Sequence, residues 1–235
     1  MFLDALPGPL ARIDLQRLVS NLDGSFRMFG GKSQAAPMDV VHVASKRPPF
    51  AQMSTCVLES KTLARVVISN VRANPFFAGV SIVAHPRPEL DAPSLVADLR
   101  IVATGKSVLD VDAAGPATHR PEFMKRFHAP LARLLDGVPP SIRKFPLPRW
   151  MAPMSGDCGA RLVARPFAGR DLERILLKYV DAYLGALAQA AAIQGENGSH
   201  ALAELFAKHA PSGKYLRRAF GQDFATRYSR LVWQK

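Results

Sequence analysis

An aspartate stands in the middle of an apolar run whose pattern is typical of a β-strand. Asp98 lies within residues 95–103, and another apolar run covers residues 76–84. A carboxylate inside a strand needs a cation, a polar partner or a chemical role, because burying it without one is costly. Arg100 is two positions away and therefore lies on the same strand face. Asp98 is thus either half of a structural ion pair on an exposed face or an acid with a function.

The segment between these two runs is rich in proline. It contains Pro86, Pro88 and Pro93. Proline has no backbone N–H to donate, so these residues exclude a helix and interrupt pairing within a sheet. The sequence predicts a stiff, extended corner between two strands.

The composition is that of a globular protein with a sizeable core. The chain has 235 residues, of which 48% are hydrophobic. No apolar run reaches the length of about 18 residues that a membrane span requires. The N-terminus has an acid and prolines where a targeting signal would need its apolar helix. Cys56 and Cys158 have no metal-ligand spacing and are expected to be reduced, so we predict a cytoplasmic protein without a membrane partner.

The net charge is strongly positive and predicts an acidic partner. The formal charge is +12 and the pI about 10.2. Such a charge suits nucleic acid, an anionic membrane, an acidic protein or a substrate that carries carboxylates. Residues 120–149 and residues 208–235 hold seven Lys and Arg each. These two clusters indicate a basic patch, and the alternative is a well-solvated surface without a partner.

Apolar and β-branched runs predict a series of strands. The runs lie at residues 39–44, 52–59, 62–71, 76–84, 95–103, 107–111 and, after a proline-rich crossing at 139–153, at 161–164. The first six follow one another with short connections. This order favours an antiparallel meander over parallel strands joined by helices.

Apolar residues at helical spacing predict helices before and after these strands. The ranges are 9–22, 122–135, 171–193, 201–209 and 214–232. In the last of them Gly221 either costs about 1 kcal/mol relative to Ala or marks a break.

The expected fold is of the α/β (α+β) class, a single-domain α/β/α sandwich with a central antiparallel sheet. Residues 1–235 form one domain, with an N-terminal helix and loop in residues 1–50 and the core in residues 50–235. If helices cover both faces of the sheet, Asp98 does not face open water. It then points into a gap between sheet and helix, where a ligand could lie.

Several common kinds of site are excluded by their missing motifs. The six histidines do not form a metal-binding spacing with one another, so we predict no catalytic metal. The sequence has neither a GxSxG nucleophile elbow nor a GxGxxG dinucleotide loop. Charge alone supports nucleic acid as a partner, and we therefore do not expect one.

Three segments resemble the ferredoxin-dependent bilin reductases. Residues 85–99, HPRPELDAPSLVADL, resemble that family's PRPEFD.PMFGADLV signature, and residues 216–228, LRRAFGQDFATRY, resemble its closing LEKAFGxxWAERY. Residues 156–157 followed by residues 165–166 resemble a third segment. The resemblance covers about residues 50–235 and is greatest to the phycocyanobilin-forming members. The related red chlorophyll catabolite reductases show that this fold accepts other tetrapyrroles.

The resemblance implies an enzyme that reduces an open-chain tetrapyrrole such as biliverdin. Members of the family hold the bilin between the sheet and the C-terminal helices. They take single electrons from an acidic ferredoxin, bind neither flavin nor metal, and obtain protons from side chains in a radical mechanism. Asp98 falls on the family's proton donor. We also expect a monomer. The two basic clusters should form one rim around the mouth of the pocket, where an acidic ferredoxin docks.

The sequence departs from the family at several site positions. Ser81 stands where the phycocyanobilin-forming members have a histidine that pairs with the aspartate. His85, on the same strand face, or a water held by Ser81 is expected to replace that histidine. A second family acid has no counterpart, because the aligned run is residues 209–212. A non-catalytic tetrapyrrole-binding protein on the same fold is therefore the alternative function.

Further residues are candidates for substrate binding. Ser107 falls on a family serine that helps to hold a propionate. Phe220 either contacts the pigment or belongs to the apolar stripe of its helix. Propionates also require cations, and the candidates are Arg143, Lys144, Arg149 and Lys214.

Overall fold

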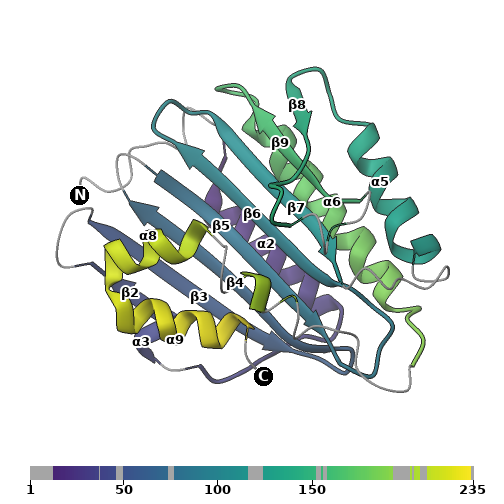
Figure 1. Ribbon diagram of the computed structural model, residues 1–235, viewed down its shortest axis with the longest axis horizontal. Helices are drawn as coiled ribbons and strands as arrows, with labels where there is room; N and C mark the ends of the chain where they lie inside the picture. Colours follow the sequence, from purple (N-terminus) through teal and green to yellow (C-terminus); the bar gives the residue numbers. More distant parts are fainter. Residues whose placement is uncertain are drawn as a thin grey trace.

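A twisted antiparallel sheet forms the centre of the protein (Figure 1). The computed structural model describes residues 13–36, 38–45, 50–73, 77–115, 124–151, 155, 158–192, 202, 204–206 and 211–233. Within these residues the sheet has nine strands in the order β1-β3-β4-β5-β6-β7-β9-β8, and β2 also pairs with β3. The strands are β1 (Lys32–Ser33), β2 (His42–Ala44), β3 (Ala51–Glu59), β4 (Leu63–Ala73), β5 (Phe77–Pro86), β6 (Ser94–Val102), β7 (Ser107–Ala114), β8 (Ile142–Phe145) and β9 (Ala160–Ala164).

The predicted meander is confirmed for β3 to β7, which pair in sequence order. The corner between β5 and β6 is not fully extended as expected, because it contains a turn in which the Leu90 N–H donates to the Arg87 carbonyl at 3.0 Å. Two further differences concern short elements. Residues predicted to begin a strand form the helix α3 (Met38–Val41), and β8 lies in the segment predicted to be a proline-rich crossing.

Helices α2 (Leu15–Met28) and α6 (Gly169–Leu187) cover one face of the sheet (Figure 1). Helix α2 begins at its N-cap Asp14, whose carboxylate accepts from the backbone N–H of Arg17 at 3.0 Å. The sequence predicted an end at residue 22, just before Gly24, but α2 continues to Met28. Its apolar stripe continues to the fully buried Phe26, and this burial outweighs the low helix propensity of one glycine.

The other helix boundaries also differ from the sequence-based ranges. Helix α6 ends six residues before the predicted position 193. There the chain leaves the helix to meet the β5–β6 corner, where the Asp91 N–H donates to the Ala191 carbonyl at 2.9 Å. The helix predicted over residues 122–135 is a π-helical turn, η1 (Met124–His128), followed by α5 (Ala129–Asp136), which packs against α6.

The opposite face of the sheet is covered by α8 (Pro211–Phe220) and α9 (Gln222–Trp233) (Figure 1). Gly221 separates them and has a φ of 93°, a left-handed conformation that glycine adopts without strain. The break at Gly221 is therefore confirmed. Of the helix predicted at 201–209, only residues 202 and 204–206 are described.

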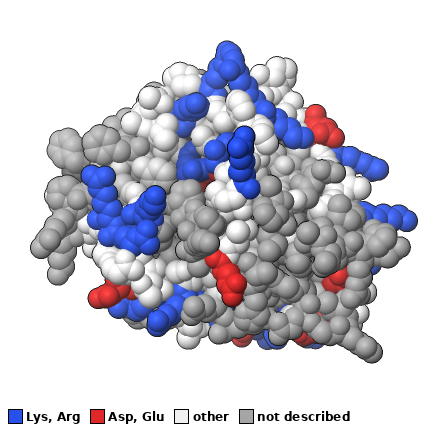
Figure 2. Space-filling model, in the orientation of Figure 1, with Lys and Arg blue, Asp and Glu red and all other residues white. Residues whose placement is uncertain are grey.

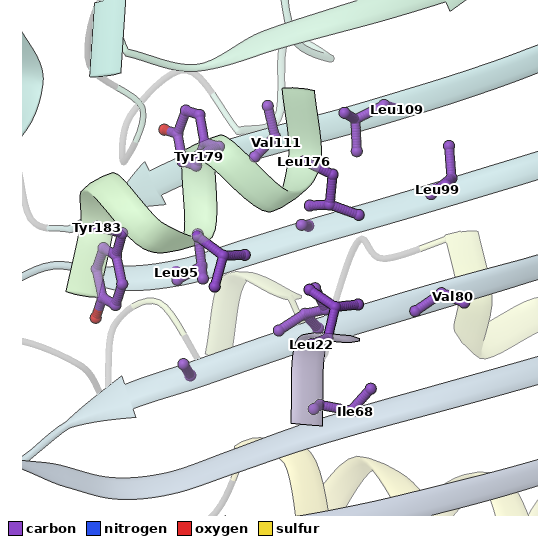
Figure 3. Packing of buried hydrophobic residues seen from close by; sticks show 14 of the residues in the cluster. Leu22, Ile68, Val80, Leu95, Leu99, Leu109, Val111, Leu176, Tyr179 and Tyr183 are labelled. Carbon is purple, nitrogen blue, oxygen red and sulfur yellow. The ribbon is translucent and has the colours of Figure 1, made fainter. Parts of the chain in front are cut away.

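The main hydrophobic core lies between the sheet and the α2–α6 layer (Figure 3). Leu95 of β6 lies near Tyr183 of α6, and Leu99 and Leu109 lie farther along β6 and β7 in the same cluster (Figure 3). Both tyrosine hydroxyls are satisfied, because each donates to a backbone carbonyl at 2.8 Å. Helices cover both faces of the sheet, so the predicted sandwich class is confirmed. No helix among the described residues is long and apolar enough to span a membrane.

Candidate functional site

A row of polar residues crosses the sheet on the face that α8 and α9 cover. Each of six neighbouring strands contributes one residue, which is paired with the corresponding residue of the adjacent strand. Because paired residues point to the same side of the sheet, all six side chains lie on one face. The row consists of Thr55, Ser69, Ser81, Asp98, Asp110 and Arg161. The sheet therefore brings Asp98 and Ser81, which the sequence singled out, side by side.

A cavity of about 270 Å³ lies between this row and the C-terminal helices. Most of its lining is apolar or aromatic, with Tyr215 of α8 and Tyr228 of α9 on the helical side. Phe206 and Trp233 stack with ring centroids 4.5 Å apart and form part of the wall. All residues of the row except Thr55 line this otherwise apolar cavity, an arrangement typical of a ligand site.

Asp98 presents its carboxyl group to this cavity. Its side chain is 39% accessible, and the accessible surface opens into the cavity. Loss of contact with bulk water raises the pKa of Asp98 to about 6, and the neighbouring Asp110 adds to the increase, while Arg100 and Arg161 oppose it. The predicted ion pair exists, with Arg100 Nε 3.2 Å from Asp98 Oδ2, but it faces a covered cavity and not open water.

Asp110 and Arg161 are site residues that the sequence reading missed. Arg161 donates a two-pronged pair of hydrogen bonds to Asp110, at 2.7 Å from Nε and 2.8 Å from Nη2. Arg100 also binds Asp110, through Nη2 and Oδ2. Asp110 lies inside a predicted strand, as Asp98 does, and this second acid at a mid-strand position was the available signal.

His85 lies on the same strand face but is not part of the cavity lining. Its ring is buried between β5 and α9, with Nε2 2.8 Å from the Val232 carbonyl and Nδ1 3.0 Å from the Ser94 hydroxyl. A carbonyl only accepts, so Nε2 carries a proton, and in the neutral ring Nδ1 accepts from Ser94. Nε2 thus holds α9 to the sheet and Nδ1 contacts β6, so both nitrogens are engaged and the structure does not bring His85 to Asp98.

Ser107 and Phe220 also lie away from the cavity. Ser107 is fully buried on the opposite face of the sheet, in register with Ile101, so it cannot hold a propionate in this cavity. Phe220 packs against Phe224, with ring centroids 5.0 Å apart, in the layer between α8 and the sheet. Of the aromatic residues on the last helix, Tyr228 and Trp233 line the cavity.

The four basic candidates are exposed and lie outside the cavity lining. Arg143 and Lys144 are on the edge strand β8, where Lys144 pairs with Asp136 at 3.0 Å. Arg149 precedes the lining residue Trp150, and Lys214 precedes the lining residue Tyr215. The basic residues inside the cavity are Arg100 and Arg161.

Part of the first basic cluster lies away from the cavity, so the two clusters do not form one continuous rim as we expected. Lys125, Arg126 and Arg133 lie on η1 and α5, which pack on α6 in the layer behind the sheet. The C-terminal cluster lies on α8 and α9, over the cavity. Figure 2 shows that the basic side chains on the α8–α9 face form separate groups. Arg120, Lys208 and Lys235 lie outside the described residues.

Another aspartate of β7, Asp112, is fully buried near the end of that strand. Burial raises its pKa to about 7, although hydrogen bonds from Ser155, Cys158 and the Ala113 backbone partly oppose the increase. Gly159 makes room for this carboxylate, because a Cβ at that position would lie 2.6 Å from Asp112 Oδ1. Asp112 does not line the cavity. Among the described residues, no group of three or more His, Cys, Asp or Glu could hold a metal ion.

Comparison with known proteins shows a similarity of fold. No family model and no curated protein sequence matches the chain. The structure is similar to that of phytochromobilin synthase from tomato, solved in complex with biliverdin, with a TM-score of 0.75. The alignment covers 94% of this chain and 83% of the synthase, at 13% sequence identity. The two proteins therefore share a fold.

Proposed function

We propose that this protein reduces an open-chain tetrapyrrole of the biliverdin type, with Asp98 as proton donor and an acidic ferredoxin as the source of electrons. The observation that carries the proposal is an acid with a raised pKa in an apolar cavity between the sheet and the C-terminal helices. The fold shared with a synthase solved with biliverdin supports it. The three segments that resemble bilin reductase motifs agree with it.

The chemistry requires an acid with these properties. Adding two electrons to a conjugated double bond also adds two protons, and single-electron steps pass through a radical anion that must be protonated. A carboxyl group with a pKa of about 6 is partly protonated near neutral pH and transfers its proton readily. Asp98 supplies one of the two protons, and solvent that reaches the cavity supplies the other and reprotonates Asp98.

Ser81 takes the place of the histidine that phycocyanobilin-forming bilin reductases have beside this aspartate. It is directly opposite Asp98 in the sheet and lines the cavity. Its hydroxyl can hold a water next to the carboxyl group, whereas both ring nitrogens of His85 are engaged elsewhere. We therefore assign the supporting role to a water at Ser81.

The proposal is tested by anaerobic incubation with biliverdin, reduced ferredoxin and a ferredoxin reductase. We expect the absorption of the bound pigment to shift over time as its conjugation is shortened. The control omits ferredoxin, which should leave the spectrum static. Failure of biliverdin to bind would contradict the proposal.

A static spectrum with bound pigment would instead support a binding protein that lacks turnover. Two departures from the family motivate this second candidate: Ser81 at the histidine position and residues 209–212 at the position of the second acid. The same spectra separate the two functions, because binding alone changes the absorption once and does not progress.

A further inference from the structure

Asp98 and Asp110 both line the cavity beside Arg100 and Arg161, but the hydrogen bonds from these two arginines go to Asp110. Asp110 accepts from both nitrogens of the Arg161 fork, at 2.7 and 2.8 Å, and from Nη2 of Arg100. Asp98 is 3.2 Å from Nε of Arg100, but that N–H has no hydrogen-bond partner. The contact between Asp98 and Arg100 is therefore an attraction between charges without an aligned hydrogen bond.

The other groups around Asp98 do not supply the missing donor. On the helical side, the Tyr228 hydroxyl donates to the Ser69 hydroxyl at 2.9 Å. Tyr215 lines the cavity from α8, and Ser81 lies opposite Asp98 on β5. Among the described residues, none donates a hydrogen bond to the Asp98 carboxyl group.

We propose that Asp110 is a positioning residue of the cavity: it occupies both guanidinium groups and so leaves Asp98 free to exchange a proton with a ligand. This inference rests on the proposed function, in which Asp98 is the proton donor. Asp110 itself is not the proton donor, because its oxygens accept three charge-assisted hydrogen bonds.

The physical reason is competition between two carboxylates for two cations. A carboxylate that accepts charge-assisted hydrogen bonds is stabilised as the anion, which lowers its pKa, whereas one without them protonates more readily. If Asp110 were absent, Arg100 could turn its fork to Asp98 and hold it as an anion. Asp98 would then hold its proton less tightly near neutral pH.

Two variants should change the pKa of Asp98 in opposite directions. In Asp110→Asn, two guanidinium groups lose their anion and act on Asp98, so the pKa of Asp98 should fall by about 1 unit or more. In Arg100→Gln, Asp98 loses its cation while Asp110 keeps Arg161, so the pKa of Asp98 should rise. Asp136→Asn is the matched control, because Asp136 pairs with Lys144 on the surface.

The experiment is a pH titration of the ligand-free protein, followed by NMR of ¹³C-carboxyl-labelled aspartate. The Asp98 signal is identified by its absence in Asp98→Asn. An Asp98 pKa that is unchanged or raised in Asp110→Asn would overturn the inference. If that variant does not fold, Arg100→Gln decides, since an unchanged or lowered pKa there would also overturn it. The Asp136→Asn control should leave the Asp98 titration unchanged.

The result is separable from the proposed function because the titration uses no pigment. If biliverdin is not reduced, the proposed function fails, whatever the NMR shows about Asp110. If biliverdin is reduced, Asp110→Asn should also shift the pH profile of product formation to lower pH, in parallel with the Asp98 pKa. A profile that stays in place while the pKa falls would overturn the link between Asp110 and turnover.

Discussion

At the scale of single residues, the proposed reaction depends on the titratable proton of Asp98. Asp98→Asn keeps the shape of the side chain and removes this proton. We expect pigment binding to persist and product formation to fall by about 10²–10⁴-fold, the usual effect of losing a general acid. Electrons still arrive, so a one-electron-reduced radical should accumulate. Product per folded molecule and radical absorbance under anaerobic conditions measure both effects.

The rival interpretation of Asp98 gives a different outcome in the same assay. If Asp98 only pairs with Arg100, then Asp98→Asn and Arg100→Ala would weaken folding modestly and leave turnover per folded molecule unchanged. Asp136→Asn serves again as the control for the loss of one acid. Wild-type turnover in Asp98→Asn would contradict the assignment of Asp98 as the proton donor.

Asp112 makes the stability of the protein depend on pH. Its folded-state pKa of about 7 is raised above its unfolded value, so the unfolded chain loses this proton at lower pH than the folded protein does. The associated stability, about 4 kcal/mol, is present below about pH 4 and is lost as the pH rises to about 7.

The corresponding variant is Asp112→Asn, which has no proton to lose. Relative to the wild type, its free energy of unfolding should increase with pH over the same window, by up to about 4 kcal/mol. Urea unfolding at several pH values measures the difference, with the exposed Asp136→Asn as control. Parallel pH curves for Asp112→Asn and the wild type would show that Asp112 is not held protonated.

The sequence located part of this site and could not locate the rest. Asp98 was visible because an acid interrupts an apolar run, and Ser81 because it stands at a position defined by the family pattern. The partnership of Asp110 with Arg161 depends on strand register across a long connection, which alternation alone does not determine. His85 was placed on the correct face, but its hydrogen bonds to β6 and α9 could not be foreseen.

At the scale of elements, the break between α8 and α9 rests on one glycine. Gly221 has a φ of 93°, and nothing lies within 4 Å of where its Cβ would be. Gly221→Ala therefore meets no clash but places alanine in the left-handed region, which should cost about 1–2 kcal/mol of stability.

A second glycine provides the matched comparison. Gly24 also has nothing within 4 Å of the point where a Cβ would lie, but it stands inside α2 in an ordinary helical conformation. Gly24→Ala should therefore stabilise the protein by about 1 kcal/mol. Thermal unfolding of the two variants compares the same chemical change in two backbone conformations. Changes of the same sign would show that the left-handed conformation at position 221 does not depend on glycine.

Element boundaries were the least predictable feature of the fold. Helix α2 runs past Gly24 because burial of Phe26 adds more stability than one glycine removes. Helix α6 stops early because its next residues pair with the corner between β5 and β6. Strand β8 has only four residues between prolines, and it exists because the edge of β9 offers a partner. In each case a tertiary contact overrides local propensity.

At the scale of the whole molecule, the position of the basic residues suggests which face an acidic ferredoxin would approach. The exposed Lys214, Arg217 and Arg218 lie on α8, above the cavity. Attraction between exposed charges is screened by salt, with a Debye length of about 8 Å at physiological strength. Turnover at sub-saturating ferredoxin should therefore fall steeply as salt is added, as measured by initial rates.

The two basic clusters allow the docking face to be identified. Neutralising Arg217 and Arg218 to Gln should raise the KM for ferredoxin and reduce its salt dependence. The same change at Lys125 and Arg133, in the layer behind the sheet, is the control and should leave both unchanged. Turnover that does not respond to salt, or that responds only to the control pair, would contradict docking at α8.

The sandwich architecture was predictable because consecutive strands and flanking helices leave few arrangements. The placement of the basic clusters was not, since charge counts along the chain do not say which layer an element joins. Residues 120–149 read as a single basic cluster, yet its described Lys and Arg side chains divide among η1, α5, the edge strand β8 and the loop before Trp150.

The strands below the cavity and the helix above it are synthesised at different times. The floor strands β3 to β7 pair with their neighbours in sequence, so they can associate as the chain leaves the ribosome. Part of the cover comes from α9, in which Tyr228 contacts Ser69 across 159 positions and the Val232 carbonyl contacts His85 across 147. During synthesis the polar residues of these strands therefore stay uncovered until α9 has left the ribosome and packs over them.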